Sequence, residues 1–209
     1  MKRLLALLLC VLAIASFTSC SNSTESPADA AVTYTPAVLD GQTYRSTFLG
    51  LTATLPSHFT AHTTEQLEEL NGFSLDTATD SFKDGAVKAQ IIYDLYAANN
   101  NGDSIDIQLE NCEVSALDVS TAAEYAVLVS DEYAKTLESI GYQNVTVTVT
   151  EHDFAGQAYP AIRASAAIGQ FTLHQKVVFK KVGPYVARIT VGSFTESTVD
   201  NLLACFSAL

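Results

Sequence analysis

The chain has 209 residues, 48% of them apolar, and its 11 basic and 23 acidic side chains give a net charge of −12. This apolar share supports one folded domain and excludes a disordered chain. The acidic balance argues against nucleic acid as a partner and suits a soluble surface that faces an anionic membrane.

Residues 1–19 have the pattern of a bacterial export leader. Lys2 and Arg3 form a positive start, and the apolar run over residues 4–17 is shorter than the ~20 residues of a membrane span. The small residues before Cys20 resemble the lipobox of bacterial lipoprotein precursors. The resemblance implies that Cys20 is lipidated and anchors the protein on the outer face of the cytoplasmic membrane. An ordinary signal peptide cleaved elsewhere is the alternative.

The segment after the leader is rich in Ser, Thr, Ala and Pro and has no apolar periodicity. We therefore expect residues 20–40 to be the lipidated cysteine and a flexible linker, with a reach of ~25 Å. Residues 41–209 are expected to form a single globular domain.

The sequence of the first half of this domain predicts a strand pair, a helix, a hairpin and a second helix. Thr63 and Gln66 form a capping box that starts a helix ended by Gly72, and Leu67 and Leu70 form its apolar face. A second capping box starts a long helix. The expected ranges are 44–48 and 51–55 for a strand pair, 63–72 for a helix, 91–95 and 105–109 for a hairpin, and 121–141 for the long helix.

The second half predicts four strands and a last helix. Alternating apolar residues indicate strands over 145–150, 162–168, 171–179 and 185–191, and apolar spacing indicates a helix from 195 to the end. Strands joined mainly by hairpins imply an antiparallel sheet. We expect an α+β fold with a sheet of about six strands and helices packed on it.

The start of the domain carries a family resemblance. The runs YRSTFLGL at 44–51 and TTEQLEELNG at 63–72, with Pro56 and Phe59 between them, look like small exported lipoproteins of Gram-positive bacteria with a PsbP-like fold. The resemblance implies a PsbP-like α/β/α sandwich over residues 42–209 and no enzymatic activity. Proteins of this fold bind different partners, so the resemblance transfers no function.

His58 and His62 are the best candidates for metal ligands in the sequence. They are four residues apart in a loop between a strand and a helix, and no third ligand follows nearby. They are therefore weak candidates, and we expect no metal and no cofactor. They support an alternative function as a ligand- or metal-binding sensor.

Basic residues gather on the late strands. A two-residue turn at 169–170 places Arg163 opposite Lys176, and a three-residue loop at 181–183 would place Lys176 opposite Arg188. The expected basic face then comprises Arg163, Lys176, Arg188, His174 and Lys180.

Neighbouring like charges repel, so something must offset this row. Carboxylates of a covering helix, such as Glu132 or Glu138, are one answer. An anionic partner, such as a lipid headgroup, a wall polymer or an acidic peptide, is the other.

The sequence shows no pattern of nucleophilic catalysis. It has no G-x-S-x-G motif, and Cys112 has no histidine nearby. A disulfide between Cys112 and Cys205 and two buried thiols both remain open. We therefore expect a non-catalytic, membrane-anchored binding or scaffold domain for an unknown envelope protein or polymer. A cell-envelope hydrolase is a further alternative.

Overall fold

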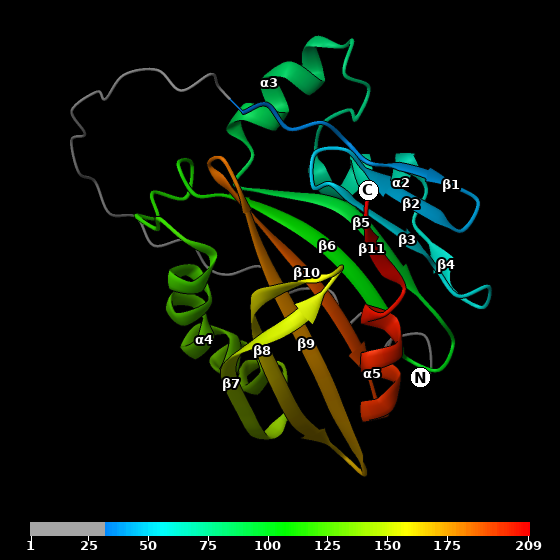
Figure 1. Cartoon of the computed structure of the whole chain (residues 1–209), viewed down its shortest axis with the longest axis vertical. Coiled ribbons are helices and arrows are strands. Elements are labelled where there is room, and N and C mark those ends of the chain that lie inside the picture. Colours follow the sequence, from blue (N-terminus) through cyan, green and yellow to red (C-terminus); the bar gives the residue numbers. More distant parts are fainter. Residues whose placement is uncertain (1–31) are drawn as a thin grey trace.

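The computed structural model describes residues 32–209. The predicted leader, Cys20 and the first part of the linker lie outside this range. The described chain is α+β with antiparallel sheets and helices, as expected (Figure 1). The expectation of about six strands is wrong, because the chain builds two sheets. One has four strands in the order β1-β2-β3-β11, and the other has seven in the order β4-β5-β6-β10-β9-β8-β7.

The elements of the described chain have the following bounds. The strands are β1 (Val38–Asp40), β2 (Thr43–Ser46), β3 (Leu51–Thr54), β4 (Thr60–Ala61), β5 (Ile91–Ala98), β6 (Ser104–Asn111), β7 (Gln143–Phe154), β8 (Gln157–Ile168), β9 (Phe171–Val182), β10 (Tyr185–Ser193) and β11 (Phe206–Ala208). The helices are α2 (Thr64–Asn71), α3 (Asp80–Lys88), α4 (Ala122–Ser139) and α5 (Glu196–Leu203).

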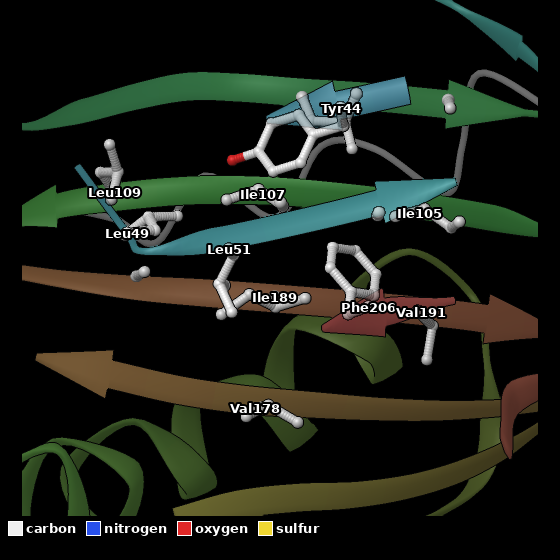
Figure 2. Packing of buried hydrophobic residues seen from close by; sticks show 14 of the residues in the cluster. Tyr44, Leu49, Leu51, Ile105, Ile107, Leu109, Val178, Ile189, Val191 and Phe206 are labelled. Carbon is white, nitrogen blue, oxygen red and sulfur yellow. The ribbon is translucent and has the colours of Figure 1, made fainter. Parts of the chain in front are cut away.

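The small sheet packs on one face of the large sheet. Tyr44 and Leu51 of the small sheet meet Ile107 and Ile189 of the large sheet in one buried cluster, and β11 adds Phe206 (Figure 2). The helix α5 joins this layer. The helix α4 covers the opposite face, over β7, β8 and β9, and forms a second cluster. The large sheet is therefore buried on both faces over much of its width.

Local capping signals place the two helices that the sequence predicted best. Thr63 and Gln66 form the expected capping box at the start of α2, and Gly72 ends it at φ +72°. Thr121 and Glu124 form the box that starts α4. Both pairs act within one turn of helix, so neither depends on the rest of the fold.

The ordered fold begins earlier than the predicted boundary at residue 41. The Tyr34 side chain is only 1% exposed, and its hydroxyl donates to Oδ1 of Asp94 at 2.5 Å. The Ala37 amide donates to the same oxygen at 3.1 Å, and Tyr44 donates to Oδ2 at 2.6 Å. The predicted linker is wrong here because Tyr34 finds its partner 60 residues further along, which composition does not reveal.

The register between β9 and β10 differs from the predicted one. The turn contains two residues, Gly183 at φ +56° and Pro184, and Lys176 lies opposite Val191. The predicted pairing of Lys176 with Arg188 is thus three residues out of register, and an odd shift moves each side chain to the other face. Arg188 therefore lies on the α4 face, where only 6% of it is exposed.

Candidate ligand-binding site

A cavity of about 560 Å³ lies over β5 and β6 of the large sheet, beside β4 and α2. Its volume is in the range of small-molecule sites. Asp106 and Gln108 of β6 contribute to it from the face of the sheet that carries Arg188. The lining residues are His58, Thr60, Ala61, His62, Gln66, Leu70, Tyr93, Tyr96, Ala98, Asn99, Asn100, Asp106 and Gln108.

One wall of the cavity is α2, and the Asn71 side chain joins this helix to the sheet with two hydrogen bonds. Asn71, the last residue of α2, donates from Nδ2 to the Tyr93 carbonyl at 3.0 Å and accepts from the Tyr93 amide at 2.7 Å. This double contact holds Gln66 and Leu70 at the cavity. Of the two leucines expected on the apolar face of this helix, Leu67 is buried, whereas Leu70 is 48% exposed. Its side chain lines the cavity instead.

The β5–β6 turn forms the rim and is stabilised by Asn99. Oδ1 of Asn99 accepts from the backbone amides of Asn101 and Asp103 at 2.8 and 3.1 Å. Its Nδ2 donates to Oδ2 of Asp103 at 2.7 Å, and Ser193 donates to the other oxygen at 2.6 Å. These contacts give the rim a defined shape.

A buried polar network lies beside Gln108. Arg188 donates a hydrogen bond to Oε1 of Gln108, and Tyr125 of α4 donates to Oε2 of Glu110. Burial disfavours the charge on Arg188, but Tyr125, Glu110 and Asp106 favour it and raise the pKa of the guanidinium. Arg188 therefore stays charged between the strands, and it holds the Gln108 amide in one orientation.

Asp106 is the ionisable acid of the cavity, and it is incompletely satisfied. Its Oδ1 atom is buried and has no hydrogen-bond partner within residues 32–209. Burial raises the pKa of this carboxyl from 3.8 to about 7, although Arg188 and hydrogen bonds from Gln108 and Thr190 act to lower it. Buried carboxylate oxygens are normally hydrogen-bonded. Asp106 is thus a polar group of the cavity whose buried oxygen is unpaired among the described residues.

The fold places both sequence-predicted histidines at this cavity. His58 and His62 line it together with Asp106. The ring of His62 packs edge-on to Tyr96 with centroids 4.5 Å apart, and burial lowers the pKa of His62. Within residues 32–209 no three His, Cys, Asp or Glu side chains assemble with the geometry of a metal site.

Sequence reasoning missed Asp106, although the pattern on β6 carried a signal. Asp106, Gln108 and Glu110 alternate there with Ile105 and Ile107. Regular alternation indicates a strand with one apolar and one polar face. In this sheet, however, most of the polar face is covered by protein, so its polar groups form a buried network and a cavity floor.

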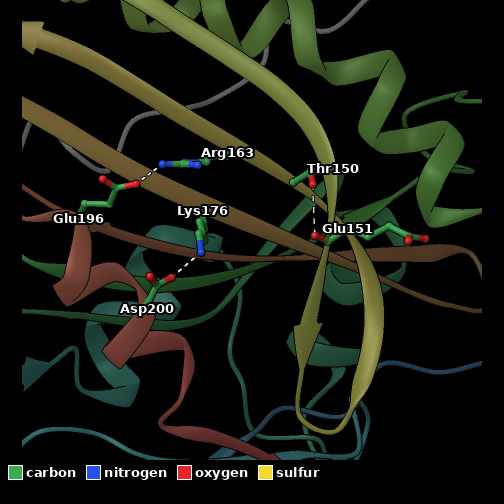
Figure 3. Close-up of polar contacts among 6 residues, drawn as sticks. All are labelled: Thr150, Glu151, Arg163, Lys176, Glu196 and Asp200. Carbon is green, nitrogen blue, oxygen red and sulfur yellow. Dashed lines mark hydrogen bonds and ion pairs between the residues drawn. The ribbon is translucent and has the colours of Figure 1, made fainter.

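The predicted basic face exists in part. Arg163 lies opposite Lys176 as predicted, with His174 and Lys180 on the same face of β9. Arg163 pairs with Glu196 and Lys176 with Asp200, both on α5 (Figure 3).

Lys180 and the cysteines also have defined environments. The Lys180 ammonium donates to the Leu49 carbonyl at 2.6 Å and lies 5.7 Å from the Tyr159 ring centre. Glu196 and Asp200 of α5 thus supply the carboxylates that offset the basic row. The expectation that Glu132 or Glu138 supplies them is wrong. Cys112 and Cys205 are free thiols, so the disulfide is not formed; Cys112 is buried as the other alternative expected, whereas Cys205 is only half-buried.

Comparisons with known proteins add little. No family model matches the sequence, and no curated protein matches it. One similar solved structure is that of a protein of unknown function from Pseudomonas aeruginosa, with 14% identity and a TM-score of 0.32. The match covers 47% of this chain and 62% of that chain. Within residues 32–209 no helix has the length and apolarity to cross a bilayer. Fold and cavity define an α+β protein with a candidate small-molecule site.

Proposed function

We propose that this protein is an exported lipoprotein, anchored through lipidated Cys20, whose PsbP-like domain binds a small molecule without catalysing a reaction. The observation that carries the proposal is the cavity of about 560 Å³ over β5 and β6. Ligand sites combine apolar and aromatic walls with a few placed polar groups. This cavity has four aromatic rings, those of His58, His62, Tyr93 and Tyr96, and the partly buried side chain of Asp106.

The preference for binding rests on the size and the aromatic lining of the cavity. The described residues that line it include no serine, cysteine or lysine, but Thr60, Asp106 and the two histidines are of types that can act as nucleophiles, acids or bases.

The early start of the fold shortens the proposed tether. Between Cys20 and Val32, the first described residue, the sequence has only residues 21–31. A chain of this length spans at most about 40 Å when fully extended. A domain anchored at Cys20 would therefore bind its ligand close to the outer face of the cytoplasmic membrane. A receptor for an envelope molecule would act at this place.

A cavity-filling variant tests the binding function. Ala98→Trp places a large ring at the cavity, whereas Ala158→Trp places the same ring on an exposed position of β8. A library of small metabolites is screened by thermal shift against wild type and both variants. We expect compounds that raise the Tm of wild type and Ala158→Trp but not of Ala98→Trp. If no compound separates the two variants, the ligand-binding proposal is wrong.

The anchor is tested on the native protein. Mass spectrometry of protein purified from its own membrane should find an acylated Cys20 as the N-terminus, and Cys20→Ala should release the domain from the membrane. An N-terminus at another position, with an unmodified Cys20, would refute the lipoprotein proposal.

A further inference from the structure

The charges around the cavity floor do not balance. Three ionisable side chains, Asp106, Glu110 and Arg188, lie together on adjacent strands β6 and β10. Glu110 and Arg188 are at most 6% exposed, and each has a hydrogen-bond partner. Asp106 is the second acid beside a single base, and its Oδ1 atom has no partner among the described residues. With all three ionised, the group carries one uncompensated negative charge next to the cavity.

We propose that the ligand of this cavity is a small organic ammonium ion, with at least one N–H donor on a compact aromatic or apolar body. The inference rests on the proposed binding function and specifies its ligand class. An N–H donor would approach the part of the Asp106 side chain that lines the cavity, and the positive charge would balance the acidic surplus. Charge-assisted bonds of this kind are about twice as strong as neutral ones.

The charge of Asp106 acts in the cavity although its Oδ1 atom is buried. Asp106 is one of the lining residues, so part of its side chain faces the space. An ionised carboxylate shares its charge between two equivalent oxygens, so a cation in the cavity is attracted without any rotation of the side chain.

The walls of the cavity also suit a cation. Tyr93 and Tyr96 lie on β5 next to the strand of Asp106, and Tyr96 is the cross-strand partner of Asp106. The negative faces of aromatic rings attract ammonium groups, more strongly where water is displaced. Burial lowers the pKa of His62, so this imidazole stays neutral near pH 7 and does not repel a cation.

An anionic ligand fits less well. Arg188 is the guanidinium closest to the floor, but it does not line the cavity, and it is engaged by Gln108. An anion would meet the Asp106 carboxyl first. The described chain carries 9 basic and 21 acidic side chains, and such a surface attracts cations and repels anions.

Three probes of similar shape test the ligand class on wild-type protein. Binding of phenethylammonium, neutral 2-phenylethanol and anionic 3-phenylpropionate is measured by calorimetry at pH 8 and constant ionic strength. We expect phenethylammonium to bind at least tenfold more tightly than 2-phenylethanol, and 3-phenylpropionate to show no saturable binding. This comparison needs no variant, so it does not depend on whether a mutant folds.

Two variants then locate the charge that is recognised. Asp106→Asn should weaken phenethylammonium binding at least tenfold and leave 2-phenylethanol within about threefold. Asp200→Asn removes a carboxylate that pairs with Lys176 on the opposite face of the sheet, and it should change neither.

The outcomes separate this inference from the proposed function. Equal or tighter binding of the alcohol or the carboxylate, lost in Ala98→Trp, would overturn the ammonium inference and leave the binding function standing. The absence of saturable binding of phenethylammonium to wild type at millimolar concentration would overturn the inference as well. The library screen with Ala98→Trp decides the binding function independently.

Discussion

Arg188 on β10 donates a hydrogen bond to Gln108 on β6, and Gln108 in turn lines the cavity. The acceptor atom is Oε1, so the amide nitrogen of Gln108 is available for the bond to Asp106 that lowers the pKa of that carboxyl. A buried charge in the sheet thus orients two side chains of the cavity floor. Stability of the sheet and shape of the candidate site depend on the same residue.

Replacement of Arg188 should therefore strongly destabilise the protein. Arg188→Met removes the charged donor of Gln108 and the positive charge near the buried Glu110, and leaving such buried polar groups without their partner costs about 1–3 kcal/mol or more. The matched control is Arg163→Met, whose pair with Glu196 is more than half exposed and should cost about 1 kcal/mol or less. Urea denaturation measures both. If the free energy of unfolding falls no more for Arg188→Met than for the control, the structural role of the network is contradicted.

Asp106 should make stability depend on pH. Its pKa is raised from 3.8 to about 7 in the folded protein, so the folded state binds more protons than the unfolded state between these values. The stabilisation is complete below about pH 4 and is lost as the pH rises through 7.

The matched variant isolates this carboxyl from its neighbours. Arg188, Glu110, Tyr133 and His62 surround the same region and are unchanged in Asp106→Asn. The Tm of wild type should fall between pH 5 and pH 8 by more than the Tm of Asp106→Asn, as measured by scanning calorimetry. Parallel curves for the two proteins would show that Asp106 titrates normally.

Tyr34 should hold the N-terminal segment on the domain. Tyr34→Phe keeps the buried ring and removes the hydroxyl that donates to Asp94. Loss of a bond to a buried carboxyl costs about 1–3 kcal/mol, and limited proteolysis should cut the chain before β2 faster. Tyr159→Phe, whose hydroxyl makes only a 3.5 Å contact with Gln157, should behave as wild type. Equal protection of both variants would mean that packing alone retains the segment.

Gly85 should resist replacement although it lies inside a helix. A Cβ at this position would lie 2.4 Å from Cβ and Cγ of Phe73. Alanine improves helix propensity by about 1 kcal/mol, but overpacking typically costs about 1–3 kcal/mol. We expect Gly85→Ala to lower the free energy of unfolding, while Val87→Ala on the exposed side of α3 should not. A stabilised Gly85→Ala would show that Phe73 moves aside freely.

The sequence by itself was sufficient where the signal is local. The capping boxes at Thr63 and Thr121 act within four residues, and the helices α2 and α4 begin where these boxes predict. The turn at residues 169–170 likewise set the register of β8 and β9, including Arg163 opposite Lys176. Such features need no knowledge of distant residues, because their hydrogen bonds close within a turn.

Tertiary structure decided the side to which Arg188 points. β10 is the central strand of the large sheet, and all nine of its residues are buried. A strand covered on both faces does not alternate between apolar and exposed positions, so its pattern leaves the register open. The two-residue turn at Gly183 and Pro184 fixes the register between β9 and β10 in the folded protein.

The candidate site likewise exists only in the fold. His58, Tyr96 and Asp106 belong to different segments and meet because β4, β5 and β6 pair side by side. Composition and spacing determined that the chain forms an α+β domain with α2, α4 and the β8–β9 hairpin, whereas the helix predicted from residue 195 to the end stops at Leu203 and is followed by β11. Contacts between residues far apart in sequence decide which polar groups are buried and which of them lacks a hydrogen-bond partner. These contacts form only when both faces of the large sheet are covered.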